Sequence, residues 1–218
     1  MKKEICKLHW QDKHYPKNLL ALPDNERPKL LYVSGEIKKR NRKAVAVIGS
    51  RKMTTYGRKV AVTFARELAR KGITIVSGLA RGIDTVAHKA ALSAGGRTIA
   101  VLGCGLDIIY PPENKFLAEK IRKNGVLISE FSPGTKPLAR NFLTRNRIIS
   151  GLSLAVLVVE GARRSGTLST AAWAANQGRE VFAVPGPINS PLSQAPLFLI
   201  ENGAQIARKP KDILDVIV

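Results

Sequence analysis

The residues of this sequence best suited to bind a ligand are glycines, hydroxyls and arginines that gather in short loops. Two such loops carry the candidates Gly49, Ser50, Arg51, Gly78, Arg81 and Gly82. Glycine lets a ligand approach the backbone N–H groups closely, and an arginine guanidinium can donate a pair of hydrogen bonds to a phosphate. The chemistry predicted for these loops is the binding of phosphate-bearing anions.

Two further basic segments extend this pattern. The first contributes Arg140, Phe142, Arg145, Asn146 and Arg147, and the second contributes Arg163, Arg164 and Ser165. Guanidinium groups hold phosphates, while an exposed phenylalanine offers a nucleobase a surface on which to stack. Residues 140–147 equally suit the start of a helix whose phenylalanine packs inward, so the sequence leaves the position of Phe142 open.

Patterns for catalysis or metal binding are scarce. His88 lies four residues after Asp84, but a shared helix face satisfies such a pair without catalysis. We expect Asp84 to cap that helix or to fix its loop. Cys104 sits in a glycine-rich turn with no evident base beside it. The chain has only three histidines and lacks C-x-x-C, H-E-x-x-H and P-loop patterns, so we predict no metal, no cofactor and no catalytic residue.

The overall charge supports a polyanionic partner. The 218 residues include 36 Lys and Arg against 16 Asp and Glu, a formal net charge of +20. Nucleic acid is the most common polyanion, whereas a merely lysine-rich surface is usually balanced by acids that are scarce here.

No apolar run approaches the roughly 18 residues of a membrane span, and the N-terminus does not resemble a signal peptide. With two widely separated cysteines, these features predict a cytoplasmic protein without membrane contact.

Short apolar runs alternate with amphipathic stretches from residue 44 onward. The runs predict strands at 44–48, 73–76, 98–102, 126–128, 154–159 and 181–184, and the stretches predict helices at 57–71, 84–94, 114–123 and 167–177. This alternation predicts an extended Rossmann-like, doubly wound α/β fold with a mostly parallel sheet and helices on both faces. In such folds the ligand lies beyond the carboxyl ends of the strands, where the candidate loops fall.

We expect a basic N-terminal extension, residues 1–43, packed on a Rossmann-like core, residues 44–218, that is the candidate single-stranded DNA-binding domain. Several strand ends carry both glycines and basic residues. A basic groove across one edge of the sheet fits a strand of nucleic acid better than it fits one small ligand.

Motifs along the chain then resemble one family. They read G-S-R at 49–51, S-G-L-A-R-G-I-D at 77–84, I-Y-P at 109–111, R-N-R-I-I-S-G-L at 145–152 and S-G-T-L-S-T-A at 165–171. In this order they resemble the DNA-processing protein A family (DprA, also called Smf). The matches run from about residue 15 to the C-terminus, and this colinearity is far more specific than any single motif.

The resemblance implies a homodimer that binds single-stranded DNA without strong sequence preference and has no established catalytic activity. It implies protection of incoming strands during natural transformation and loading of the RecA recombinase. By the resemblance, Arg51 lies in a basic DNA pocket and Phe142 contacts a base. A family lysine is replaced by Ala139, and the adjacent Arg140 is its candidate substitute.

Two departures leave alternatives open. Residues 193–200 lack the Ser-x-Gly-x-Asn pattern, so dimer geometry and RecA contacts do not carry over, and the chain reads as a minimal core without a winged-helix domain.

The alternative function is a Rossmann-like nucleotide-binding protein or a nucleotide phosphoribohydrolase. Those hydrolases carry P-G-G-x-G-T-x-x-E, but Thr170 stands where the glutamate would be.

Overall fold

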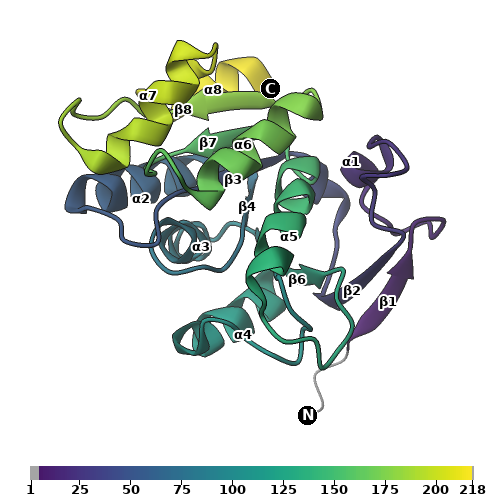
Figure 1. The fold of residues 1–218 in the computed structure, drawn as a ribbon. Coiled ribbons are helices and arrows are strands. Elements are labelled where there is room, and N and C mark those ends of the chain that lie inside the picture. The colour runs from purple at the N-terminus through teal and green to yellow at the C-terminus, as the bar shows by residue number, and fades with distance from the viewer. Residues whose placement is uncertain (1–4, 218) are drawn as a thin grey trace.

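A nine-stranded sheet forms the middle layer of the protein in the computed structural model, which describes residues 5–217 (Figure 1). The strands are β1 (Cys6–His9), β2 (Leu30–Gly35), β3 (Ala44–Ile48), β4 (Thr74–Ser77), β5 (Thr98–Val101), β6 (Val126–Ser129), β7 (Ala155–Val158), β8 (Glu180–Ala183) and β9 (Gln205–Ile206). The six strands predicted from the sequence correspond to β3 to β8, to within a residue at each end.

Helices cover both faces of this sheet. They are α1 (Lys17–Leu20), α2 (Thr55–Arg70), α3 (Ile83–Ser93), α4 (Lys115–Asn124), α5 (Ala139–Gly151), α6 (Gly166–Asn176), α7 (Gln194–Glu201) and α8 (Pro210–Ile217), with short 3₁₀ turns η1 (Lys39–Arg42), η2 (Pro112–Asn114) and η3 (Pro191–Ser193). The predicted doubly wound α/β fold is confirmed. The four predicted helices are α2, α3, α4 and α6. Helices α1, α7 and α8 were not predicted, and α5 was considered only as an alternative for residues 140–147. Within residues 5–217, each helix is too short or too polar to span a membrane.

The two faces of the sheet explain the continuous apolar runs. In β3, Val45 and Val47 pack with α2 and α3, while Ala44 and Ala46 point to the opposite face, toward α5 and α6. Successive side chains of a strand alternate between faces, so a strand covered on both sides is mostly apolar along its whole length. All five residues of β3 are buried.

Residues 5–43 contribute to the same sheet. Strands β1 and β2 pair antiparallel, and β2 also pairs antiparallel with β6 at the edge of the parallel strands. Tyr15, Leu19, Leu22 and Leu31 are buried in the apolar cluster that also holds one face of β3. The segment therefore packs into the shared core on that face.

The strand order reverses at the centre of the sheet. From β3 the order runs outward through β4, β5 and β6 on one side and through β7, β8 and β9 on the other. The parallel part of the sheet runs in the order β6, β5, β4, β3, β7, β8 and β9. The loops that follow these strands therefore emerge at the same edge of the sheet. We call it the carboxyl edge, and it holds the switch point at which such folds bind ligands.

Candidate nucleic-acid interface

The candidate residues from three different segments meet at the carboxyl edge. A shallow hollow, here called the carboxyl-edge pocket, is lined by Arg51, Gly78, Ala80, Arg81, Tyr110, Pro111, Phe142 and Arg145. Its cavity volume of about 20 Å³ is too small to enclose a ligand. A ligand that uses these residues must therefore lie across the surface, as an extended strand does.

Phe142 is half-buried at the start of α5, between the two positions that the sequence left open. The guanidinium carbon of Arg51 lies 5.5 Å from the centroid of its ring, and the Tyr110 ring lies 5.6 Å from it, centroid to centroid. A Cβ at Gly103 would lie 2.7 Å from the Phe142 ring, so the glycine makes room for it. Packing holds the ring in place beside an exposed cation, which suits it to stack on a base.

Arg145 lines the floor of the pocket and is almost completely buried. Its side chain is only 4% exposed and donates hydrogen bonds to the carbonyl oxygens of Gly78, at 2.9 Å, and Val101. Burial lowers the pKa of Arg145 to about 10, which leaves the group charged at neutral pH. A Cβ at Gly78 would overlap the guanidinium, so this glycine is required for the arrangement. This position does not suit the direct phosphate contact predicted for Arg145, and it indicates a structural role.

Asp84 fixes the loop after β4. Its carboxylate accepts hydrogen bonds from the backbone N–H groups of Gly78, at 3.0 Å, and Ala80, at 3.3 Å. The N-cap of α3 is Gly82, so the capping role considered for Asp84 is wrong and the loop-fixing role is confirmed. Burial raises the pKa of Asp84, and the nearby charge of Arg145 opposes that rise.

The loops after β3 and β4 touch through their backbones. The N–H of Ile83 donates to the Ser50 carbonyl at 3.1 Å, and a Cβ at Gly82 would overlap that same carbonyl. Gly82 also has a φ of +74°, which favours glycine. On the other side, a Cβ at Gly49 would lie 2.8 Å from the Glu160 carbonyl. Both glycines therefore allow the close packing that sets the position of Arg51.

The other arginines differ in how free they are. Arg81 and Glu113 are both exposed and form an ion pair at the rim of the pocket. Arg147 is held by a two-pronged ion pair with Glu130, at 2.6 and 2.7 Å, in a largely buried position. A phosphate at Arg147 would have to displace a well-formed pair, whereas one at Arg81 would compete with a solvated carboxylate.

The remaining candidates flank the pocket. Arg140 is exposed on the first turn of α5, and the buried Asn146 donates to the Gly166 carbonyl at 3.2 Å. Arg163 and Arg164 are exposed in the loop before α6, where the Arg163 guanidinium carbon lies 5.6 Å from the Phe198 ring centroid. Ser165 occupies the N-cap of α6, but its side chain makes no capping hydrogen bond. The exposed arginines among these residues are cations beside the switch point, whereas Asn146 makes a structural contact.

Neither group considered for catalysis is poised for it. His88 is buried, its Nδ1 lies 2.6 Å from Thr98 Oγ1, and burial lowers its pKa to about 3. Cys104 is also buried, and burial raises the pKa of its thiol to about 11. At neutral pH the imidazole is uncharged and the thiol is protonated. The described part of the chain shows no cluster of three metal-ligating side chains.

Two residues that shape the site were not among the candidates predicted from the sequence. Tyr110 lines the pocket through its contact with Phe142, and only its place in a family motif pointed to it. Glu160 follows β7, is buried, and accepts hydrogen bonds from the N–H of Thr54, at 2.9 Å, and from its hydroxyl. A lone glutamate after an apolar run gives no signal of a partner so far away in the sequence.

Comparisons with known proteins identify the family of this chain. The family model described as DNA recombination-mediator protein A matches residues 7–217. Protein Smf of Escherichia coli (strain K12) is 52% identical over 202 residues, which cover 92% of this chain and 54% of that protein. The chain thus spans about half the length of this relative.

Two solved structures share the fold over almost the whole chain. DNA processing protein A (DprA) from Streptococcus pneumoniae superposes with a TM-score of 0.93 at 41% identity, covering 99% of this chain and 75% of that one. DNA processing protein A from Helicobacter pylori, described with a single-stranded DNA binding mode, gives a TM-score of 0.85 at 33% identity, covering 99% and 97%.

Proposed function

The chain belongs to the DNA recombination-mediator protein A family, and we propose that it binds single-stranded DNA across the carboxyl edge of its sheet. The observation that carries the proposal is the contact of Arg51, Phe142 and Tyr110 around one shallow hollow. A stacking surface beside an exposed guanidinium recognises an unpaired base together with its phosphate. A base inside a duplex cannot reach such a surface.

Charge supports a path along this edge. Arg51, Arg81 and Arg140 are exposed around the pocket, and Arg163 and Arg164 continue toward the switch point. Each phosphate neutralised by one of these side chains releases a condensed counterion. Binding should therefore weaken steeply as salt is added.

The direct test compares a fluorescent oligo-dT strand with a matched duplex by anisotropy over a salt series. We expect the single strand to bind more tightly, and Arg51→Ala to weaken binding and reduce the slope of log K against log salt by about one. Arg66→Ala removes an exposed arginine of α2 and serves as the matched control. Equal, weak binding of strand and duplex would contradict the proposal.

Removing Glu113 should strengthen binding. Glu113→Gln abolishes the ion pair that occupies Arg81 and removes a negative charge from the rim of the pocket. Because an exposed pair contributes only about 0.2–1 kcal/mol, we expect a gain of up to about fivefold at low salt. Glu67→Gln breaks the exposed pair with Arg70 on α2 and removes the same charge. A similar gain in both variants would mean that only net charge matters.

We propose that the protein acts by binding and not as an enzyme. The residues that line the carboxyl-edge pocket include no carboxylate, and the buried His88 is neutral. Cleavage of a base from a nucleotide needs a general acid or base at the reacting bond. Incubation with AMP should release no free adenine, and release that Arg51→Ala abolishes would support the hydrolase alternative.

The family description names recombination mediation, and we propose that the protein acts in natural transformation, where it protects incoming strands and loads RecA. The test is the rate at which RecA covers single-stranded DNA with and without this protein. Faster coverage would support loading, and an unchanged rate would contradict it.

We further propose that the protein works in the cytoplasm, which suits its two free cysteines.

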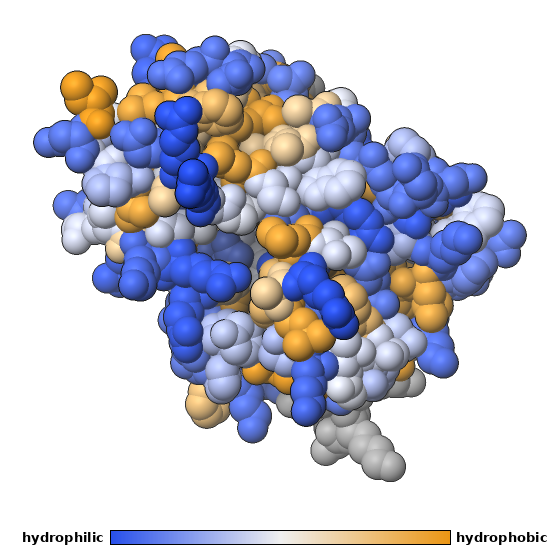
Figure 2. All heavy atoms as spheres, viewed as in Figure 1, coloured by the Kyte–Doolittle hydropathy of each residue, from blue (hydrophilic) through white to orange (hydrophobic). Residues whose placement is uncertain are grey.

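A homodimer is also proposed. Figure 2 shows apolar side chains gathered on the part of the surface where Figure 1 places α7. Residues 197–200 of α7 are only half-buried, and Ile188 in the preceding loop is 83% exposed. Exposed apolar patches of this kind mark contacts between proteins. Light scattering at micromolar concentration should give the mass of a dimer, and a monomer mass would contradict the proposal.

A further inference from the structure

A second pocket lies at the edge of the sheet opposite the carboxyl edge. This amino-edge pocket has a cavity volume of about 170 Å³ and is formed by residues 13–18, 37–39, Asn41, Arg42, Ile99, Ile128 and Leu152. It lies where β3 and β7 begin, whereas the carboxyl-edge pocket lies where β3 and β4 end. Five residues of β3 span about 16 Å, so the two pockets are separate sites.

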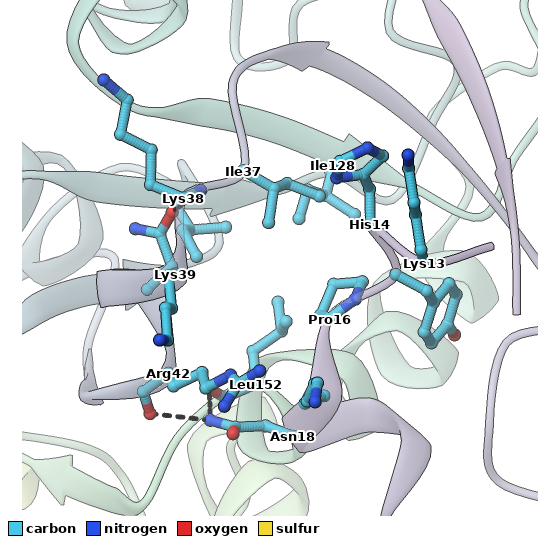
Figure 3. A pocket seen from close by; sticks show the side chains of 14 residues that line it. Lys13, His14, Pro16, Asn18, Ile37, Lys38, Lys39, Arg42, Ile128 and Leu152 are labelled. Atoms are coloured by element: carbon cyan, nitrogen blue, oxygen red, sulfur yellow. Dashed lines mark hydrogen bonds between the residues drawn. The ribbon is translucent and has the colours of Figure 1, made fainter.

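The inner part of the amino-edge pocket is apolar. Ile99, Ile128 and Leu152 are buried, and Ile37 is half-buried. Figure 3 shows the side chains of Ile37 and Leu152 pointing toward each other across the cavity, with His14 beside Ile128. A cavity of about 150 Å³ in another protein accepts a benzene molecule. The space here therefore suits a single six-membered ring better than a fused pair of rings.

The rim of this pocket is cationic. Lys13, Lys17, Lys39 and Arg42 are exposed and form no ion pair within residues 5–217. Lys38 differs, because it pairs with Glu36 at 2.9 Å and points away from the cavity in Figure 3. The described lining contains no carboxylate. An apolar interior with uncompensated cations at its mouth suits an anion that carries a small ring.

Hydrogen bonds hold the walls of the pocket in place. The side-chain amide of Asn18 donates to the carbonyls of Arg42, at 3.0 Å, and Leu152, at 2.8 Å. Asn41 accepts from the Lys38 N–H at 2.7 Å and donates to Thr74 Oγ1 at 3.0 Å. A pocket fixed in this way binds its ligand without a large cost of ordering the chain.

We infer that the amino-edge pocket binds a pyrimidine nucleoside phosphate, with the ring between Ile37 and Leu152 and the phosphate at Lys39 and Arg42. The same chemistry has two sources, a free nucleotide or a nucleotide within a strand of DNA. The inference does not rest on the proposed function, because it uses none of the residues at the carboxyl edge.

Calorimetric titration of the whole chain with dTMP, dAMP and inorganic phosphate tests the inference. We expect dTMP to bind more tightly than either of the others. Lys39→Gln combined with Arg42→Gln should weaken dTMP binding about tenfold or more, a loss of about 1.4 kcal/mol. Lys59→Gln combined with Arg66→Gln removes two exposed charges from α2 and should leave dTMP binding unchanged.

Further variants separate this site from the carboxyl edge. Ile37→Phe fills the cavity while keeping every charge, so it should abolish dTMP binding. It tests the pocket independently of the charge variant, should that variant fail to fold. Arg51→Ala should leave dTMP binding intact. In that background, displacement of dTMP by oligo-dT would identify a strand as the source, and no displacement would identify the free nucleotide. Absent dTMP binding, equal binding of phosphate alone, a preference for dAMP, or loss in Arg51→Ala would overturn the inference.

Discussion

Replacing Arg145 with leucine is expected to lower the free energy of unfolding at pH 7 by about 3–5 kcal/mol. The guanidinium donates hydrogen bonds to the carbonyls of Gly78 and Val101, and its charge lies near the buried carboxylate of Asp84. Leucine fills much of the space but leaves both carbonyls without this donor and the carboxylate without its counter-charge. Urea unfolding, followed by fluorescence, measures the loss.

The loss should also depend on pH. Burial already raises the pKa of Asp84, and Arg145 opposes that rise. Without Arg145, the pKa of Asp84 in the folded protein rises further above its unfolded value of about 3.9. The folded state then holds the extra proton between those two pKa values, so stability falls as the pH rises through that window. Arg145→Leu should therefore cost more at pH 7 than near pH 4, and adding Asp84→Asn should recover part of the loss.

Two controls separate this effect from a general loss of arginine. Arg66→Leu makes the same change at an exposed position and should alter the free energy of unfolding by less than about 0.5 kcal/mol. Arg145→Lys keeps a positive charge near Asp84 and should be milder than leucine. If Arg145→Leu cost no more than Arg66→Leu, or if Asp84→Asn gave no recovery, the buried pairing would not stabilise the fold.

Arg51 and Arg145 show what the sequence could and could not predict. Both belong to basic motifs, and by residue type alone both suit phosphate. One is exposed, whereas the other is buried beneath a loop that lies 67 residues away along the chain. Burial of a polar side chain depends on such distant contacts, which local spacing does not report. The missed contact between Glu160 and Thr54 has the same cause.

The strands were predictable for the opposite reason. In β3 to β7 every residue is buried, so each strand leaves a nearly continuous apolar run in the sequence. Helix α5 gave no such pattern, because Asn141, Arg145 and Asn146 are buried on it. These polar groups interrupt the apolar spacing of a helix, and α5 is the element that carries Phe142.

Replacing Phe142 with alanine is expected to weaken binding of single-stranded DNA by about 1–3 kcal/mol, because a base loses its stacking partner. Phe142→Leu keeps the apolar contact at Gly103 but removes the flat ring. It should therefore preserve the stability of the fold while losing most of the same affinity. Anisotropy with oligo-dT and urea unfolding on both variants separate the two effects. Affinity that survives in both, with only stability reduced, would place the ring in the core.

The Phe142 ring should also affect DNA binding through its contact with Arg51. Arg51 lies 5.5 Å from the ring centroid, so losing the ring frees the guanidinium to move away from the phosphate that we propose it binds. Arg51→Ala should then cost less in the Phe142→Ala background than in the wild type, with a coupling of about 0.5–3 kcal/mol as found for residues in contact. Arg140→Ala, on the exposed start of the same helix, should cost about the same in both backgrounds. Strict additivity for Arg51 and Phe142 would show that they bind separate parts of the strand rather than one nucleotide.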